Sequence, residues 1–315
     1  MNFNQRITRR ESIRKLLQLS GTLALSGAAA WSMQLPVASR AASEKKKFIV
    51  EAIGQAEKYD VKELTRKTFE AAGGINRFVS KGDIVVIKAN LSWARAPQFA
   101  ATTNPEVLEA VVELCQEAGA RRVRIADHTI HDARRCFAVT GAGMVAQNTG
   151  ADLIFPRSSM MKDMKLQGNK LDVWPVFVPL IEADRLINLP VAKHHSLSTL
   201  TLGMKNWIGG VGGSRSALHQ DINATVVDLA QFFKPTVTLI DAIRVLQRNG
   251  PSGGSLSDVA NKNTLILSDD PVAADARAAL LFDRQPEQLG FIRLGQKWDL
   301  GTADFQKLDQ RKVVL

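Results

Sequence analysis

The residues best suited to acid–base chemistry gather in two short parts of the chain. Three of the five histidines lie in one segment, and the other two follow an earlier predicted strand. They are His194, His195 and His219 in the later group, and His128 and His131 in the earlier one. Imidazole titrates near neutral pH and is the commonest general acid or base and the commonest metal ligand. Loops after the carboxyl ends of parallel strands converge on one ligand-binding edge, so the two groups could share a pocket. The alternative is that they are surface or capping residues.

Cations and glycines accompany the later histidines. The apolar run 186–189 predicts a buried strand, and Pro190 ends it because proline cannot donate to a ladder. His195 follows, and a helix or helical turn over 200–208 is expected to carry Lys205. This order places the candidate side chains just beyond a strand end.

The cations here predict an anion-binding site. Arg215 follows four glycines within 209–213, and a guanidinium with exposed backbone N–H groups suits a carboxylate or phosphate. The alternatives are a helix-surface lysine and a solvated loop arginine. The candidate catalytic residues are His195, His128, His131 and Lys205. The candidate cofactor-binding residues are Lys205, Asn206, Gly209, Gly210 and Arg215, and the candidate metal ligands are His219 and His195.

Strands and helices are expected to alternate along the chain. We therefore predict an α/β fold with a mostly parallel or mixed sheet covered by helices on both faces. The first predicted strand begins at Phe48. The other predicted strands cover 83–90, 122–126, 152–155, 173–178, 186–189, 236–240 and 264–268. The predicted helices cover 61–72, 105–118, 133–147 with a break near Gly141, 222–233, 272–282 and 285–294. Lys88 and Asn90 either line the rim of the site or only close their strand. With no internal repeat or long linker, 42–315 is predicted to be a single domain.

The first 41 residues look like a removable export signal. Thr8–Arg14 (T-R-R-E-S-I-R) resembles a twin-arginine motif, although Ser12 stands where phenylalanine is commoner. A Gly/Ala/Ser-rich apolar segment follows over 16–31, then small residues at 39–41. The resemblance implies export by the twin-arginine machinery to the periplasm or beyond, and an uncleaved segment would anchor the protein to the membrane. The alternative is a basic amphipathic helix on a membrane surface.

Net charge points to small anions rather than nucleic acid. The chain carries +10, of which residues 1–41 contribute +5 from six Lys/Arg and one Glu. Aromatic residues are sparse and do not alternate with basic ones, so a nucleic-acid partner is not expected. The remaining positive charge fits a small anionic ligand, and the alternative is that it has no functional meaning.

Several common chemistries are excluded by missing motifs. Cys115 and Cys136 cannot supply the four thiolates of an iron–sulfur cluster, and we expect two ordinary buried thiols, with a disulfide as the alternative. Gly141–Ala146 matches G-x-G-x-x-A, but a helix rather than a strand is predicted before it, so we discount a dinucleotide site. Neither a G-x-S-x-G elbow nor a phosphate-binding P-loop occurs.

Seven segments together resemble the domain-of-unknown-function family numbered 362. They are V-I-K-A-N-L (86–91), T-x-N-P-E (102–106), A-G-A-R-R-V-R-I-A-D-H (118–128), L-I-N-L-P-V-A-K-H-H (186–195), L-T-L-G-M-K-N-W-I-G-G-V (200–211), R-x-x-L-H (215–219) and D-D-P-V-A-A-D (269–275). Many relatives are described as iron–sulfur proteins because they carry an added cysteine segment, which this chain lacks. The resemblance implies a fold and a site but no established reaction.

The order of the site residues is also similar to that of nickel-pincer lactate racemases. Those enzymes have a catalytic histidine after a strand, a second histidine, a lysine that holds a pyridinium cofactor, glycines, and a histidine that binds nickel. The corresponding residues here are His128 or His131, His195, Lys205, Gly209–Gly213 and His219. The similarity implies two imidazoles exchanging protons or hydride equivalents beside a cofactor. More broadly, two or three histidines, with Asp127 or Asp221, would hold nickel, zinc or iron.

The sequence therefore predicts an exported enzyme with a histidine–lysine site for a small anionic substrate, with or without a metal or cofactor. The alternative is a non-catalytic redox-accessory or ligand-binding protein that works with an iron–sulfur redox partner.

Overall fold

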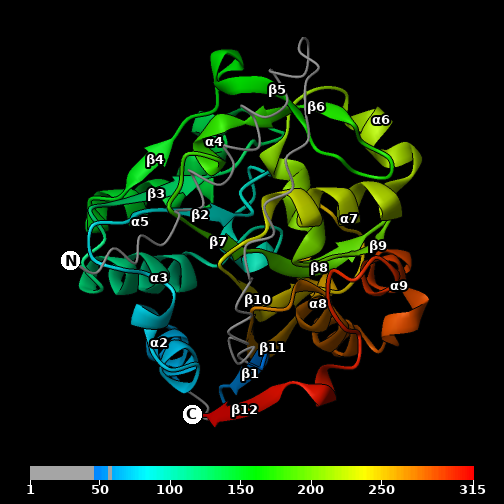
Figure 1. The fold of residues 1–315 in the computed structure, drawn as a ribbon. Coiled ribbons are helices and arrows are strands. Elements are labelled where there is room, and N and C mark those ends of the chain that lie inside the picture. The colour runs from blue at the N-terminus through cyan, green and yellow to red at the C-terminus, as the bar shows by residue number, and fades with distance from the viewer. Residues whose placement is uncertain (1–45, 56–58) are drawn as a thin grey trace, which may run out of the picture. The chain divides into compact units, whose positions relative to one another are not determined.

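A mixed sheet organises the part of the chain that the structure describes, which is residues 46–55 and 59–315 of a computed structural model (Figure 1). The strand order is β12-β1-β11-β10-β7-β2-β3-β4, and β8 and β9 extend the sheet beside β10. The strands are β1 (Phe48–Ile53), β2 (Ile84–Ala89), β3 (Arg122–Ala126), β4 (Asp152–Ile154), β7 (Arg185–Leu189), β8 (Val191–His195), β9 (Thr199–Thr201), β10 (Val237–Leu246), β11 (Val259–Ser268) and β12 (Asp309–Val314), with β5 (Met161–Lys165) and β6 (Val173–Phe177) forming a separate pair. The predicted export signal lies outside the described residues.

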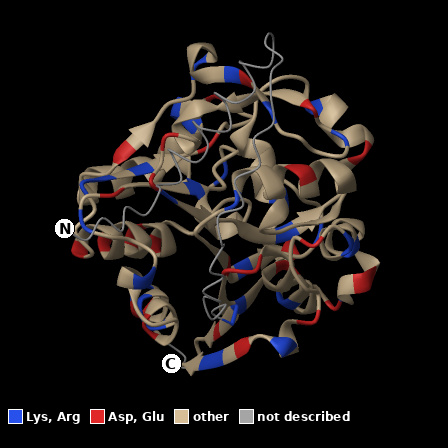
Figure 2. Ribbon diagram, in the orientation of Figure 1, with Lys and Arg blue, Asp and Glu red and all other residues tan. Residues whose placement is uncertain are grey.

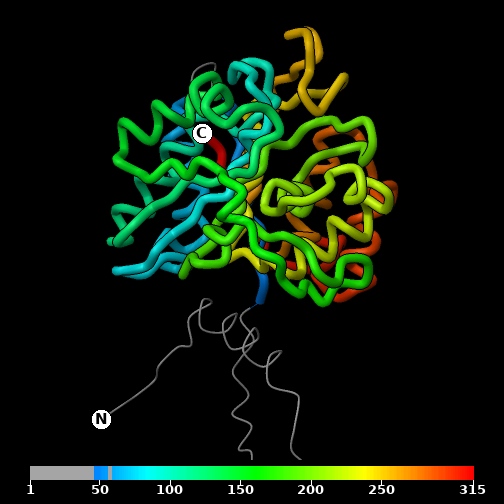
Figure 3. Tube along the Cα trace, turned by 90° about the horizontal axis from the view of Figure 1, so that it is seen from above, coloured from blue at the N-terminus to red at the C-terminus, as the bar shows by residue number. Residues whose placement is uncertain are grey.

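Most neighbouring strands run parallel, and helices cover both faces. Each strand is parallel to its neighbour in the part of the sheet ordered β10-β7-β2-β3-β4. By contrast, β11 is antiparallel to both β10 and β1. The helices are α2 (Val61–Ala71), α3 (Pro105–Glu117), α4 (Ala133–Val139), α5 (Ala142–Thr149), α6 (Arg215–Gln220), α7 (Ile222–Phe233), α8 (Pro271–Ala279) and α9 (Gly290–Lys297). Helices α2 to α5 lie on one face and α7 to α9 on the other, a division also visible from above (Figure 3). The predicted α/β class is confirmed.

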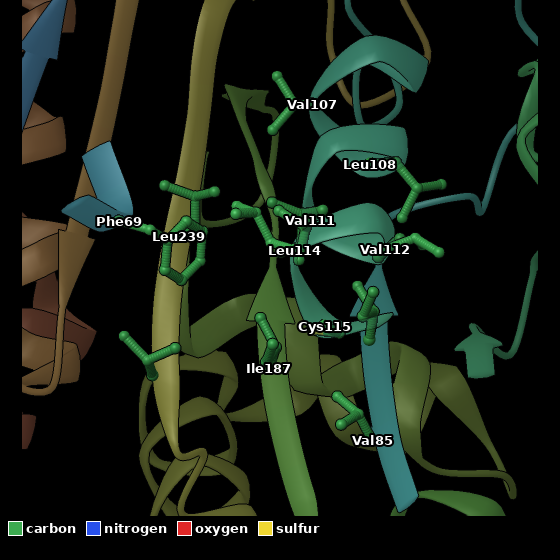
Figure 4. Packing of buried hydrophobic residues seen from close by; sticks show 14 of the residues in the cluster. Phe69, Val85, Val107, Leu108, Val111, Val112, Leu114, Cys115, Ile187 and Leu239 are labelled. Atoms are coloured by element: carbon green, nitrogen blue, oxygen red, sulfur yellow. The ribbon is translucent and has the colours of Figure 1, made fainter. Parts of the chain in front are cut away.

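The core between α3 and the sheet shows why the central strands are continuously apolar. Val107 and Val111 of α3 pack toward Val85 of β2, Ile187 of β7 and Leu239 of β10, and all five are fully buried (Figure 4). Strands covered on both faces need apolar residues at successive positions. Each such side chain contributes about 1.5–3 kcal/mol through burial, so this layer holds the parallel strands in register.

Local signals set several boundaries as predicted. Asn104 caps α3 by accepting from the backbone N–H of Glu106 at 3.0 Å, and Pro105 occupies the first turn. Gly141, with φ at +84°, separates α4 from α5 where the break was expected. A helix precedes this glycine, so the structure agrees with our rejection of the dinucleotide motif there. Cys115 and Cys136 are free and buried, as predicted.

Some predicted boundaries are wrong, mainly around the candidate site. The helix expected over 200–208 begins instead with strand β9, followed by a 3-10 helix at Met204–Gly210. Pro190 interrupts the strand only briefly, because β8 continues beside the second half of β10. β10 therefore runs to Leu246 rather than ending at 240. β5 and β12 were not predicted, and the last helix begins at Gly290 instead of 285.

Charges of both signs are interspersed along the helices and strands (Figure 2). Among the described residues, no helix is long and apolar enough to cross a membrane.

Candidate functional site

A cavity lies beyond the carboxyl ends of β7, β2 and β3. Its walls come from the loop after β2, strands β8 and β9, the 3-10 segment Met204–Gly210, and α6. The lining residues include Asn90, Ser92, Trp93, Lys193, His195, Thr201, Lys205, Asn206, Gly209, Arg215 and His219. No acidic residue is among the described residues that line it.

The cavity forms where two strands separate. Pairing between β2 and β7 ends at Ala89 and Leu189, after which β8 stays with β10 and the chain after β2 turns away. Lys193 spans the resulting gap. Its amine donates to Asn90 Oδ1 at 3.3 Å and to the carbonyl oxygen of Ala101.

A buried carboxylate holds the 3-10 segment in place. Asp275 on α8 accepts from the backbone N–H groups of Gly203, at 2.6 Å, and Met204, at 3.0 Å. Burial raises the Asp275 pKa to about 7, although the two amides act in the opposite direction. Trp207 stacks on Phe233 of α7, with ring centroids 4.7 Å apart. These contacts fix the backbone that carries Lys205 and Asn206.

Asn206 forms part of the cavity floor, and all its side-chain hydrogen-bonding capacity is used there. Its Nδ2 donates to Lys88 O at 3.1 Å and to Asn188 Oδ1 at 2.9 Å. Its Oδ1 accepts from Lys88 Nζ at 3.0 Å and from Asn90 Nδ2 at 3.2 Å. Its position therefore supports the site, but the amide has no group left to offer a ligand.

Below this floor lies a fully buried ion pair. Lys88 Nζ is 2.8 Å from Asp127 Oδ1, and the other carboxylate oxygen accepts from Leu91 N at 2.7 Å and Ser92 Oγ at 3.2 Å. A Cβ on Gly209 would lie 2.1 Å from Asp127 Oδ1 and 2.9 Å from Lys88 Nζ. Glycine is thus required here for close backbone approach.

Two lysines at the cavity have strongly lowered pKa values. Burial, together with the nearby Arg215 charge, lowers the pKa of Lys205 to about 7. Burial also lowers the pKa of Lys193 to about 7, with Lys205 adding repulsion. Both effects penalise a cation that lacks a counter-ion.

Arg215 anchors its guanidinium on one side of the cavity. Nη2 donates to His128 O at 2.7 Å and to Thr129 O at 3.2 Å. His128 Nδ1 lies 2.8 Å from Val211 O and must donate to it, so the 3.4 Å approach of Arg215 to that nitrogen is not a hydrogen bond. Burial lowers the Arg215 pKa from its ordinary value.

His195 and His219 are fixed in opposite tautomers. The backbone N–H of Leu197 donates to His195 Nδ1 at 3.1 Å, so the proton of the neutral His195 ring is on Nε2. His219 Nδ1 is 2.6 Å from Arg215 O and must donate, so its Nε2 has a free lone pair. Burial, followed by repulsion from Lys205 and Lys193, lowers the His195 pKa to about 3. His195 can donate a proton in a hydrogen bond, whereas His219 can accept one.

The structure brings most of the candidate residues to one cavity. Six of them line it: His195, Lys205, Asn206, Gly209, Arg215 and His219. His128 lines a neighbouring cavity, His131 is exposed and edge-on to Trp93, and Gly210 packs near Phe233. We did not assign Lys193 or Asp275 a site role. The position of Lys193 directly before the histidine pair indicates a place in the site. Asp275, by contrast, resembles an ordinary acidic residue in the first turn of a helix.

His195 and His219 cannot both offer a free ring nitrogen to one metal ion. A ligating histidine usually donates its other N–H to an acceptor, which is true of His219 but not of His195. Among the described residues, no three His, Cys, Asp or Glu side chains gather as a metal site. The residues present therefore do not fit a metal held by both rings.

Two comparisons with known proteins relate to this chain as a whole. It is 30% identical over 218 residues to the thylakoid-associated protein sll1697 of Synechocystis sp., a match that covers 67% of this chain and 66% of that protein, just under two thirds of its length. The lactate racemase apoprotein from Thermoanaerobacterium thermosaccharolyticum is a structural neighbour with 13% identity and a TM-score of 0.47, covering 74% of this chain and 56% of that one. A structural similarity at this level assigns no residue of this chain a role.

A family model gives the clearest relationship. The model for a domain of unknown function matches residues 85–279, which is more than half of the chain and contains the whole cavity wall from Asn90 to His219. The segments quoted above for this resemblance fall within that range. The chain belongs to the family of the domain of unknown function DUF362.

Proposed function

We propose that this protein is an enzyme that acts on a small anionic substrate in the cavity described above. The observation that carries the proposal is the charge of the wall: Lys193, Lys205 and Arg215 face the cavity, and no acidic residue among the described lining residues balances them. The carboxylate of Asp127 below is already occupied by Lys88. An anion would supply the missing counter-charge and favour the protonated form of a lysine that it contacts.

The two imidazoles make this an acid–base site rather than a simple anion trap. His219 offers a lone pair that can remove a proton, and His195 offers an N–H that can stabilise developing negative charge on oxygen. Thr201 Oγ1, in the same wall, is buried without a hydrogen bond to any described residue, so it is free to contact a ligand. We infer proton transfer at a carbon or oxygen of a bound anion.

The binding half of the proposal is tested by thermal shift with acetate, oxalate, phosphate and sulfate. We expect at least one to raise Tm saturably, and Lys193→Met to weaken that effect at least tenfold. His131→Met, outside the cavity, is the matched control and should bind like the wild type. If none of the anions changes Tm, the site is not an anion site and the proposal fails.

The catalytic half is tested by NMR of pyruvate, which has an exchangeable methyl group beside its carbonyl, in D₂O. We expect exchange of carbon-bound hydrogen in the wild type and its loss in His219→Asn. Asparagine can keep the donor to Arg215 O while removing Nε2, so this variant should still bind the anion. If the wild type also binds the anion without exchanging its carbon-bound hydrogen, the alternative of a ligand-binding or redox-accessory protein is indicated.

We also propose that the protein is exported. The support is the order of paired arginines, apolar segment and small residues over 8–41. Replacing Arg9 and Arg10 with lysine should leave the protein in the cytoplasm when the periplasmic fraction is assayed. Unchanged export would contradict a twin-arginine route.

A further inference from the structure

The three lysines near the cavity differ in how many acceptors their amines have. Lys88 donates to Ala89 O at 2.7 Å and Asn206 Oδ1 at 3.0 Å and pairs with Asp127, so its three protons are all used. Lys193 donates to two acceptors. Lys205 Nζ makes no hydrogen bond or ion pair with any residue in the described part of the chain, although the side chain is only 7% exposed.

This difference decides which amine is a nucleophile. An ammonium needs acceptors for three protons, and a buried one without them is strongly disfavoured. Burial lowers the Lys88 pKa as well, but its full set of acceptors, Asp127 among them, favours the charged form. Lys205 has none, and the adjacent Arg215 charge also opposes protonation. A desolvated lysine beside another cation keeps its lone pair near neutral pH and is activated for attack.

The neighbours of Lys205 complement this role. His195 offers an Nε2–H and His219 an Nε2 lone pair at the same cavity, so a donor and an acceptor of protons are both present. Arg215 and Lys193 offer positive charge to a carboxylate. Together these groups select a small molecule with a carboxylate at one end and an electrophilic carbon close to it.

We propose that Lys205 forms a Schiff base with the carbonyl carbon of a small oxo acid, the carboxylate of which is bound by Arg215 and Lys193. This deepens the proposed function and rests on the anion-binding site described there. The Lys205 nitrogen attacks the carbonyl carbon while His195 Nε2–H donates a hydrogen bond to the carbonyl oxygen. His219 takes the two amine protons in turn and passes each to that oxygen, which leaves as water. One C=O bond is thus replaced by one C=N bond with no oxidation or reduction.

Borohydride trapping of the full chain tests the proposal. The protein is incubated with pyruvate or glyoxylate and sodium borohydride at pH 7, digested, and analysed by mass spectrometry. We expect the reduced adduct on the peptide that contains Lys205 in near-stoichiometric amount. Acetate, which has no reactive carbonyl, should leave no adduct, and the exposed Lys307 serves as an internal control that should stay unmodified.

Variants separate nucleophile from binding residues. Lys205→Met should abolish trapping, whereas Lys193→Met should lower the yield at low pyruvate concentration and regain it at high concentration. Peptide mapping of the wild type identifies the site even if a variant fails to fold. An adduct spread evenly over surface lysines, or trapping retained in folded Lys205→Met, would overturn the proposal. If anions raise Tm but no adduct forms, the Schiff base is rejected while the anion site stands; if neither occurs, both are rejected.

Discussion

The imidazole rings of His195 and His219 lie parallel, with centroids 6.0 Å apart and planes 15° from each other. They come from β8 and α6, and backbone groups lock their Nδ1 atoms in opposite roles. Two identical side chains thus provide one donor and one acceptor without any change in ionisation. This division of roles is the structural basis for expecting acid–base chemistry here.

Replacing Lys205 with methionine should stabilise the ligand-free protein. The buried amine has a folded-state pKa of about 7 against an ordinary value of 10.5, so between these pH values only the unfolded chain binds the proton, and the resulting destabilisation is fully present below pH 7. We expect Lys205→Met to gain on the order of 3 kcal/mol in free energy of unfolding at pH 6, with the gain shrinking as pH rises from 7 to 10.5. Urea unfolding of the variant and the wild type, at pH 6 and at a pH between 7 and 10.5, measures the gain in free energy of unfolding. Lys307→Met, at a side chain 76% exposed, should change stability by less than about 1 kcal/mol.

Anion affinity should fall as pH rises above neutrality. Lys193 has a pKa of about 7 in the empty site, and the anion binds its protonated form. Each lysine that must take up a proton lowers affinity by about tenfold per pH unit above 7. Sulfate titrations between pH 6 and 9 test this, because sulfate itself does not change charge there. A constant dissociation constant over that range would contradict the assigned lysine states.

Asp127→Asn should be strongly destabilising. The substitution leaves Lys88 buried without its counter-ion and weakens a carboxylate that also accepts from Leu91 and Ser92. Breaking a buried pair on one side typically costs about 3–5 kcal/mol. The control is Asp152→Asn, whose partly exposed pair with Arg122 should be worth less than about 1 kcal/mol. Equal losses in chemical denaturation would contradict the special status of the buried pair.

Gly209→Ala should damage the floor of the cavity. The new methyl group would lie within 2.1 Å of Asp127 Oδ1, so either the ion pair or the 3-10 segment must move. Overpacking of this kind costs about 1–3 kcal/mol, and it should also weaken anion binding. Gly254→Ala, where no atom lies within 4 Å of the new methyl group, should stay within about 0.5 kcal/mol of wild type. A wild-type Tm for Gly209→Ala would show that the close approach is easily relieved.

Most of the scaffold could be predicted because its signals are local. Continuous apolar runs mark β2 and β7, and Asn104 with Pro105 marks the start of α3. By contrast, β8 contains Lys193 and two histidines, residues that do not suggest a strand. They are extended because β10 provides a pairing edge and the cavity accommodates their polar ends. β12 escaped prediction because its side chains alternate between exposed and half-buried, with no apolar face.

The site could be predicted only in outline. Chain order suggested that His195, Lys205, Arg215 and His219 gather, and they do line one cavity. It could not show that His131 stays out of the cavity lining, where its ring lies edge-on to Trp93 and accepts from Ala94 N at 3.3 Å. Ring tautomers and the missing acceptors of Lys205 likewise depend on contacts between distant segments. No spacing rule encodes them.

The separation of β2 from β8 beyond Ala89 and Leu189 also bears on how the sheet opens. Past those residues no ladder bonds join the two halves, so local unfolding should start from this end of the sheet. A ligand that contacts Lys193 on one side and the loop after β2 on the other would join the two separated strand ends and stabilise them together. Amide hydrogen exchange of Asn90–Ser92 and Val191–Lys193 should therefore slow together when the cavity is filled. Joint protection of these two segments would show that the ligand joins them, and not that it stabilises one strand alone.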